Sequence, residues 1–342
     1  MAFLIGGIEG GATISRMVLL DSSGNQLGYS EGPPTNPWLL GLEEAAERIL
    51  NLVKDVLINS NRQPTETLAR LGLSLSGADT EANQNELVNA IKKHCPNVAQ
   101  EIHICNDSIG TFLTVCDKAA IVLISGTGSI CCYVRENLTF QRIGGYGHLL
   151  GEKGSAYWIA QRMIEKLILS DDKIIDTTYN LDNVRRVIYA YFNVENNLEL
   201  LQHFYTDFSK NKVAGLCEHF SRIARTGDPL AKDVFYDAGV QLAQHVRAAL
   251  FYHVVDSMSR SQNLTVVCCG SVFKSWDLIK DGFIDFLKPS ENSEWTGTLE
   301  LVQLKHSAAY GAARLSVHSD SKVTIPTDSG VQFDKISFGV TF

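Results

Sequence analysis

Two glycine-rich turns that carry hydroxyl side chains stand out in the sequence, and each follows an apolar segment. Residues 121–129 read Ile-Val-Leu-Ile-Ser-Gly-Thr-Gly-Ser, and residues 3–13 read Phe-Leu-Ile-Gly-Gly-Ile-Glu-Gly-Gly-Ala-Thr. Glycines let a backbone approach an anion closely, successive N–H groups in a turn form an anion site, and small hydroxyls add donors. A single turn of this kind is common, but the pair indicates a duplicated phosphate-binding site.

The N-terminal turn is open to two interpretations. Its residues are Gly6, Gly7, Gly10, Gly11 and Thr13. They could contact phosphates, or they could form a tight hairpin that binds nothing. Glu9 could hold Mg²⁺ through water or be a solvated turn carboxylate. The sequence has neither the lysine-containing motif of P-loop proteins nor a dinucleotide fingerprint opening a helix.

Two segments further along end an expected strand with polar residues. Asp107, in Asn-Asp-Ser, lies where a strand gives way to a helix. It could cap the helix, or it could accept a proton from a substrate hydroxyl that attacks a γ-phosphate. Residues 266–271 end in Gly270 and Ser271, which could offer a flat surface to a nucleoside or form an ordinary turn.

Residues 144–155 contain five glycines before an expected helix. Such a backbone could surround a sugar together with Glu152. Alternatively, it could be a flexible connector, with Glu152 as a carboxylate at the helix N-terminus that the helix dipole favours. Asn36 stands before a proline, so it could bind ligand hydroxyls or belong to a turn.

The composition limits the class of protein. The 342 residues suggest two domains, and the net charge of −8 without a lysine or arginine run disfavours nucleic-acid or membrane binding. Such a protein must bind phosphates with backbone dipoles, hydroxyls and a metal ion. The eight cysteines form no Cys-x-x-Cys pair and are expected to be structural thiols. Without a signal-peptide pattern or a long apolar span, we expect a cytoplasmic protein.

Hydrophobic periodicity predicts two α/β halves, residues 1–117 and 118–342, with a ligand in the cleft where they meet. The expected strands are 3–9, 15–21, 26–31, 70–76, 101–105, 119–125, 129–135, 138–143, 264–269 and 297–303. The expected helices are 42–58, 82–94, 108–116, several from about 155 to 255, 277–287 and 307–317. In the helix near 230–255, the i, i+4 spacing of Leu230, Val234, Ala238, Leu242, Val246 and Leu250 predicts one buried stripe.

Four segments resemble the superfamily of sugar kinases, heat-shock ATPases and actin, within it the BadF/BadG-type ATPases, and most closely the eukaryotic N-acetylglucosamine kinases. They are Gly-Leu-Ser-Leu-Ser-Gly at 72–77, Val-Leu-Ile-Ser-Gly-Thr-Gly-Ser at 122–129, the segment 151–158 with Gly-Ser-Ala-Tyr-Trp, and Gly-Ser-Val-Phe-Lys-Ser-Trp at 270–276. The resemblance covers nearly the whole chain. It implies a two-lobed actin-like fold, in which a ribonuclease-H-like α/β unit is duplicated.

The resemblance also implies an activity: ATP-dependent phosphorylation of the 6-hydroxyl of N-acetyl-D-glucosamine, with Mg²⁺, in a homodimer whose lobes close on the sugar. By its place in the motif, Asp107 would be the catalytic base. The residues expected at ATP are Gly11, Thr13, Gly126, Thr127, Gly215, Gly270, Ser271 and Ser275. Those expected at the sugar are Asn36, Asp107, Ser129, Ile130, Gly145, Tyr146, Gly147 and Glu152.

Four positions depart from the family pattern. Ala12 replaces a glycine of the first turn, Ile130 replaces an asparagine, Tyr146 replaces a tryptophan, and Glu152 replaces an aspartate. Because three of them fall in the expected sugar loops, the ATP site is better supported than the exact sugar. The alternatives are a kinase for glucosamine, N-acetylmannosamine or a muramic-type sugar, and a sugar or nucleotide sensor without kinase activity.

Overall fold

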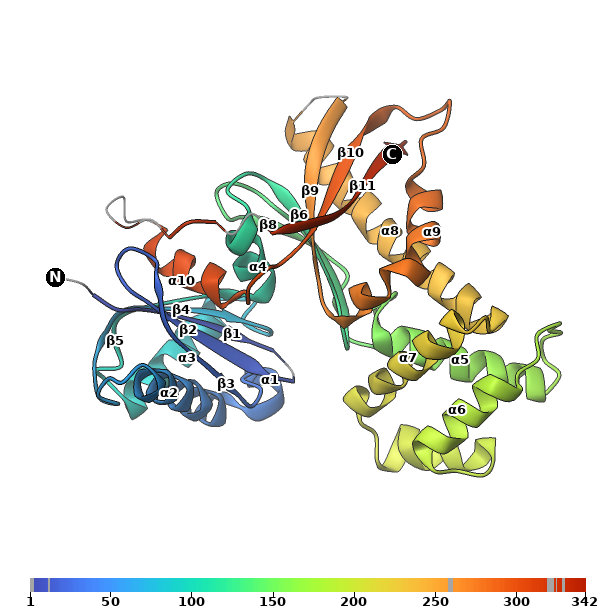
Figure 1. Ribbon diagram of the computed structural model, residues 1–342, viewed down its shortest axis with the longest axis horizontal. Helices are drawn as coiled ribbons and strands as arrows, with labels where there is room; N and C mark the ends of the chain where they lie inside the picture. Colours follow the sequence, from blue (N-terminus) through green and yellow to red (C-terminus); the bar gives the residue numbers. More distant parts are fainter. Residues whose placement is uncertain (1–2, 12, 258–260, 319–322, 324, 328–329) are drawn as a thin grey trace. The chain divides into compact units, whose positions relative to one another are not determined.

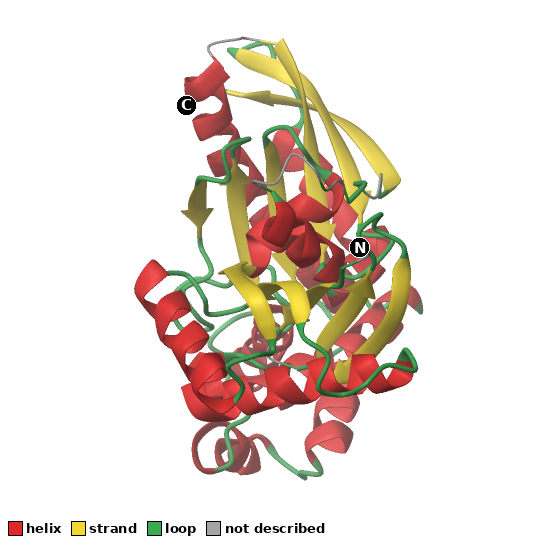
Figure 2. Ribbon diagram, turned by 90° about the vertical axis from the view of Figure 1, so that its left-hand side faces the viewer, coloured by secondary structure: helices red, strands yellow, loops and turns green. Residues whose placement is uncertain are grey.

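The computed structural model describes residues 3–11, 13–257, 261–318, 323, 325–327 and 330–342, with backbone alone at 261–262. The chain contains both helices and strands, and the strands form two sheets (Figure 2). Ala12, one of the four departures from the family pattern, lies outside the described residues.

The first sheet has the strand order β3-β2-β1-β4-β5. Two hairpins join β1 (Ile5–Gly10), β2 (Ser15–Leu20) and β3 (Gln26–Gly32) as antiparallel neighbours. On the other side of β1, β4 (Leu68–Leu75) and β5 (Ala99–Asn106) run parallel. Parallel neighbours need a crossover, and the helices α2 (Leu42–Asn59) and α3 (Glu81–His94) supply it.

Alternation along β1 decides which helices cover which face of this sheet. Ile8 packs with the apolar residues of α2 and α3, whereas Ile5 packs with Ala309 and Ala313 of α10 (Ala309–Val317). Successive side chains of a strand point to opposite faces, so α10 covers the face opposite α2 and α3. The helix α4 (Asp107–Val115) packs beside α10 (Figure 1).

The second sheet repeats this strand order and adds an edge strand: β8-β7-β6-β9-β10-β11. Its strands are β6 (Ala120–Ser125), β7 (Ser129–Val134), β8 (Phe140–Ile143), β9 (Ser261–Cys269), β10 (Trp295–Gln303) and β11 (Val331–Val340). As β1 pairs with β4 in the first sheet, β6 pairs in parallel with β9. The two sheets are therefore built on one plan, as the expected duplication requires.

The helices that follow the second glycine turn include the longest one among the described residues, α8 (Pro229–Ser257), with 29 residues. They are α5 (Ala156–Asp171), α6 (Asp182–Phe192), α7 (Lys210–Arg225), α8 and α9 (Trp276–Leu287). Every residue of the predicted apolar stripe on α8 is buried, which confirms that prediction. Gly239 of α8 and Gly282 of α9 let these helices pack closely, since a Cβ at either would lie 2.0 Å from a carbonyl oxygen of the other helix.

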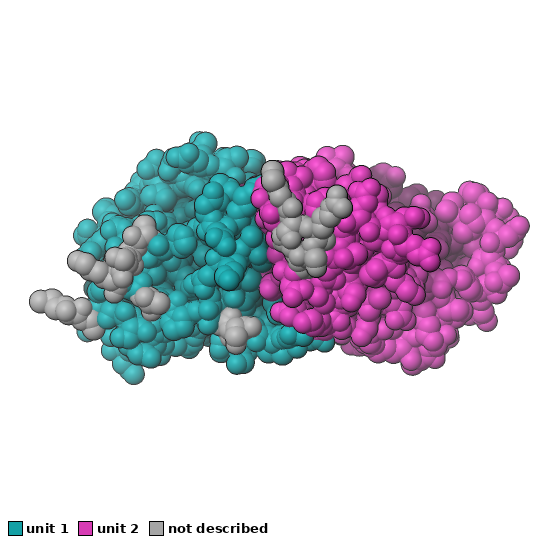
Figure 3. Space-filling view, turned by 90° about the horizontal axis from the view of Figure 1, so that it is seen from above, with its two compact units in different colours: residues 1–120, 134–139, 302–333 teal, residues 121–133, 140–301, 334–342 magenta. Residues whose placement is uncertain are grey.

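Contacts divide the chain into two compact units, coloured in Figure 3. Unit 1 comprises residues 1–120, 134–139 and 302–333, and unit 2 comprises 121–133, 140–301 and 334–342. The predicted division placed everything after residue 117 in the second lobe. In the structure α10 belongs to unit 1, because its small residues pack on the first sheet.

All the expected strands and helices are present, with boundaries within a few residues. The sequence did not reveal α1 (Pro37–Leu40), the short helices η1 (Asn197–Glu199), η2 (Gln202–Thr206) and η3 (Ser271–Ser275), or β11. None of the eight cysteines is in a disulfide, and six of them are buried, as expected for structural thiols. Within the described ranges, no helix is long and apolar enough to span a membrane.

Candidate functional site

The glycine turn at residues 126–129 joins β6 to β7 in unit 2 and is held by hydrogen bonds to the start of α5. The amide of Gly126 donates to the carbonyl of Gly128 (2.9 Å) and closes the turn. The carbonyl of Gly126 accepts the amide of Ala156 (2.8 Å), and that of Thr127 accepts the next amide of α5 (3.4 Å). The backbone of the turn is thus fixed by this helix.

Two glycines at this turn are required because other groups approach them closely. A Cβ on Gly128 would lie 2.6–2.8 Å from the carboxyl group of Glu152. Gly270 follows β9, has a φ of +106°, and a Cβ there would lie 2.2 Å from the carbonyl oxygen of Ser125. Since β6 and β9 are parallel, their carboxyl ends meet at one edge of the sheet. The turn therefore has Glu152 on one side and the segment after β9 on another.

The loop at 144–155 needs its glycines for backbone conformation. Gly144, Gly145 and Gly147 have φ values of +69°, +74° and +85°, which side chains rarely adopt. Gly145 also lies against Ile130, because a Cβ at Gly145 would come within 2.8–3.0 Å of the isoleucine side chain. Tyr146 is 61% exposed. The predicted sugar residues 130, 145, 146 and 147 thus belong to one connected part of unit 2.

The end of this loop is tied to the turn and to α7. Ser129 is buried and its hydroxyl donates to the carbonyl of Lys153 (2.9 Å). The side chain of Glu152 is only 11% exposed, and its Oε2 lies 2.6 Å from Nζ of Lys210. This ion pair places a carboxylate next to the glycine turn and a lysine ammonium group next to that carboxylate.

The residues predicted at the nucleoside lie on α7 and η3. Gly215 is an exposed position of α7, Ser271 is exposed at the start of η3, and Ser275 is buried at its end. Arg225 of α7 donates to both carboxyl oxygens of Asp277 of α9 (2.8 and 2.9 Å), just after η3. This bidentate pair lowers the pKa of Asp277 through its hydrogen bonds and ties the two elements together.

Asp107 is the first residue of α4 in unit 1, but it does not cap the helix. Asn106 is the cap, since its side-chain oxygen accepts the amide of Ile109 (3.0 Å). The capping interpretation of Asp107 is therefore wrong by one residue. Asp107 is partly buried at the end of β5, at a position where the helix dipole favours a carboxylate.

Gly6 and Gly7 are strand residues of β1 rather than members of the N-terminal turn. A Cβ on Gly7 would lie 2.0 Å from the carbonyl oxygen of Ala309, and one on Gly72 of β4 would lie 1.7 Å from that of Ala312. These glycines let α10 lie directly on the sheet. Their role in the structure is therefore packing.

Only the end of the N-terminal segment forms the predicted turn. Gly11 donates its amide to the carbonyl of Ile14 (3.2 Å), and Thr13 is exposed. Glu9 belongs to β1, where Ser307 donates to its carboxylate and Arg16 lies 3.9 Å away. Among the described residues, no three His, Cys, Asp or Glu side chains gather as metal ligands.

Asn36 caps α1, since its side-chain oxygen accepts the amide of Trp38 (2.9 Å). A Cβ on Gly77 would lie 2.4 Å from the indole of Trp38 and 2.9 Å from Oδ1 of Asn36. The last residue of the segment 72–77 therefore packs against the N-terminus of α1. A pocket of about 150 Å³ lies here in unit 1, lined in part by Trp38, Gly77 and Glu86. The turn chemistry expected at Asn36 is thus present beside a cavity.

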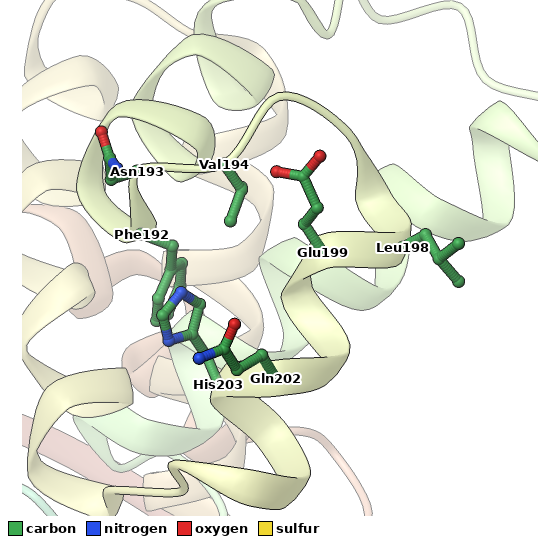
Figure 4. A pocket seen from close by; sticks show the side chains of 7 residues that line it. All are labelled: Phe192, Asn193, Val194, Leu198, Glu199, Gln202 and His203. Atoms are coloured by element: carbon green, nitrogen blue, oxygen red, sulfur yellow. The ribbon is translucent and has the colours of Figure 1, made fainter.

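A larger pocket, of about 490 Å³, lies in unit 2, and none of the predicted site residues is among those that line it. Figure 4 shows its lining: Phe192, Asn193, Val194, Leu198, Glu199, Gln202 and His203. His203 stacks on Phe192 with ring centres 5.0 Å apart. Lys210 and Phe208, which contact the loop at 144–155, were also missed, because nothing in the local sequence links them to residues more than fifty positions earlier.

Comparisons with known proteins agree with this architecture. An N-acetylmuramic acid/N-acetylglucosamine kinase of Clostridium acetobutylicum is 24% identical over 315 residues, covering 91% of this chain and 97% of that protein. An N-acetyl-D-glucosamine kinase of Dictyostelium discoideum is 22% identical over 324 residues, covering 92% and 97%. These relatives match the chain over nearly their whole lengths.

Solved structures show the same fold. A provisionally named N-acetylglucosamine kinase of Chromobacterium violaceum has a TM-score of 0.72 at 20% identity, covering 92% of this chain and 98% of that one. The ROK hexokinase of Thermus thermophilus has a TM-score of 0.52 at 14% identity, covering 92% and 99%. The fold is therefore the actin-like one of sugar kinases. Because the family model matches residues 7–316, the chain belongs to the BadF/BadG/BcrA/BcrD ATPase family.

Proposed function

We propose that this protein is an ATP-dependent sugar kinase that transfers the γ-phosphoryl group of MgATP to the 6-hydroxyl of N-acetyl-D-glucosamine. One observation carries the proposal: the turn at 126–129 has Glu152 against Gly128 and the segment of Gly270 against Ser125. One residue predicted for the phosphates (Gly126), one for the sugar (Glu152) and one for the nucleoside (Gly270) thus lie at one turn of a single unit. The family membership and the two curated kinase relatives support the same reaction.

In the proposed mechanism, Asp107 accepts the proton of the sugar 6-hydroxyl as that oxygen attacks the γ-phosphorus. The bond from the γ-phosphorus to the bridging oxygen breaks, and ADP leaves with the electron pair. The amides and hydroxyls of Thr127 and Thr13 would hold the phosphate oxygens, because this chemistry depends on positioning and charge stabilisation. Ser271, Ser275 and Gly215 would contact the nucleoside.

The exact sugar is part of the proposal. N-acetylglucosamine is favoured because both curated relatives carry it in their names. Ile130 cannot donate a hydrogen bond to an acetamide group, and it packs against Gly145 in the sugar loop. Because Ile130 is at this position, glucosamine, N-acetylmannosamine and muramic-type sugars are the competing substrates that must also be assayed.

A panel assay tests the function directly. ADP release is measured with each of these sugars at saturating MgATP, and the phosphorylated position is mapped by NMR. N-acetylglucosamine should give the highest kcat/KM and a 6-phosphate product. A higher kcat/KM with another sugar would overturn the substrate, and sugar binding in calorimetry without any phosphorylated product would instead indicate a sensor.

The base is tested with Asp107→Asn, which keeps the shape of the side chain. A general base contributes about 10²–10⁴ in rate, so kcat should fall by that factor while the affinity for ATP stays within threefold or so. Asp55→Asn, at an exposed position of α2, is the control. Retained turnover in the Asp107 variant would refute the assignment.

A further inference from the structure

The pair formed by Glu152 and Lys210 is unusual for its burial. The glutamate side chain is 11% exposed and the lysine side chain 31%. A carboxylate removed from water is destabilising unless a charge or several hydrogen bonds compensate it. Nζ of Lys210 is 2.6 Å from Oε2, yet no donor among the described residues makes a well-aligned hydrogen bond to that oxygen. The lysine therefore holds this buried oxygen by charge, and the acceptor capacity of the other oxygen, Oε1, is not used by any donor among the described residues.

This pair lies directly against the glycine turn. The carboxyl group of Glu152 occupies the space that a side chain on Gly128 would need. A shift of the carboxylate would therefore change its contact with the backbone of the turn. The lysine that fixes the carboxylate comes from α7, the helix that also carries Gly215.

An aromatic contact next to the pair fixes the same two segments. The ring of His148, in the sugar loop, stacks on Phe208 with centres 5.1 Å apart and meets the edge of Tyr157 at 4.7 Å. Phe208 precedes Lys210 by two residues, and Ser209 between them caps α7. The loop is thus docked on the start of α7 by stacking and by charge.

We propose that Lys210 is a positioning residue for the sugar: it holds the buried Oε2 of Glu152 so that Oε1 of the same carboxylate receives sugar hydroxyls. The inference rests on the proposed function and adds a residue to it. It also gives a reason why a side chain one methylene longer than aspartate works at position 152. The position of the longer carboxylate is set by its ion pair with Lys210.

The test compares Lys210→Met with Lys210→Arg and with the control Lys212→Met. Lys212 is on the same helix but points to the Phe192 ring, 5.5 Å away. Losing a charge-assisted contact to the sugar should raise its KM about 10- to 100-fold, while the KM for ATP changes less than about threefold. The arginine variant should recover most of the loss, and the Lys212 variant should match the wild type.

A double-variant cycle separates positioning from stability. Lys210→Met leaves a buried charge unpaired and should lower the Tm, and adding Glu152→Gln should restore the Tm without restoring the KM for sugar. An unchanged KM in Lys210→Met would overturn the inference, and a lowered Tm alone would show a purely structural pair. If the wild type phosphorylates no sugar, the proposed function fails, and sugar affinity measured by calorimetry still decides whether Lys210 affects binding.

Discussion

Gly270→Ala provides a stringent test of the site, because the chain contains a matched control. Gly270 and Gly227 both have a φ of +106°, but a Cβ on Gly227 would find nothing within 4 Å, whereas one on Gly270 would lie 2.2 Å from the carbonyl oxygen of Ser125. A backbone in such a sparsely populated region costs an alanine about 1–3 kcal/mol. Because the two positions share this φ, the difference between the two variants chiefly reports the contact with the end of β6.

The size of that difference follows from the contact. The atoms that a Cβ on Gly270 would meet are backbone atoms, so no side chain can rotate away. Overpacking of this kind costs about 1–3 kcal/mol, and we expect a total of about 2–6 kcal/mol for Gly270→Ala against about 1–3 kcal/mol for Gly227→Ala. In a domain of this size class, 1 kcal/mol lowers the Tm by about 2–4 °C.

The functional effect should follow the same contact. The end of β6 must move by roughly 1 Å to restore an ordinary contact, and a displacement of that size can reduce catalysis about 100-fold. Thermal unfolding and ADP release with varied MgATP measure the two effects. If Gly270→Ala unfolds at the same temperature as Gly227→Ala and keeps its kcat/KM for ATP, the close approach of β6 and the segment after β9 is not as described.

Three further predictions address thiols, a histidine and a helix contact. Alkylation of the folded protein near pH 8 should modify Cys95 and Cys269 before the other six thiols. Those six are buried, and burial raises the pKa of three of them to about 12. Equal labelling of all eight thiols in peptide mass spectra would contradict this prediction. Burial, and then a neighbouring lysine, lower the pKa of His148 below its ordinary value. The contribution of His148 to the free energy of unfolding is therefore complete above about pH 6.5 and is lost as the pH falls through the lowered pKa. His148→Gln should flatten the acid side of the profile of Tm against pH, and an unchanged profile would refute this prediction. A Cβ on Gly311 would lie 1.8 Å from the carbonyl oxygen of Gly110, so Gly311→Ala should lower both Tm and kcat by displacing α4, and wild-type values for both would exclude this contact.

Local periodicity was enough to predict most of the fold. The apolar stripe of α8 repeats along one element, and each predicted strand of the first sheet is bounded by turn residues, so neighbouring residues carry the information. The strand β11 was missed because it alternates weakly within a polar tail, and only its pairing with β10 makes it a strand. The helix boundary at Asn106 was missed by one residue, since Asn and Asp are equally good caps.

The candidate site could be predicted only where the contacting residues lie within a single sequence motif. The turn at 126–129 and the loop at 144–155 could be found from their glycines. The packing role of Gly7 depends on α10, about three hundred residues later, and the partner of Glu152 is on α7. No spacing rule links positions that meet only through the tertiary fold, so these contacts required the structure.

The discontinuity of unit 1 has a consequence for biosynthesis. Its sheet is complete when residue 106 has been made, but the helix that covers Ile5, Val18 and Leu20 begins at Ala309. At about 5–20 residues per second, the ribosome needs roughly 10–40 s to add the intervening chain. During that interval this apolar face of the sheet is not yet covered by α10 on the nascent chain. We expect a chaperone to bind and shield this face.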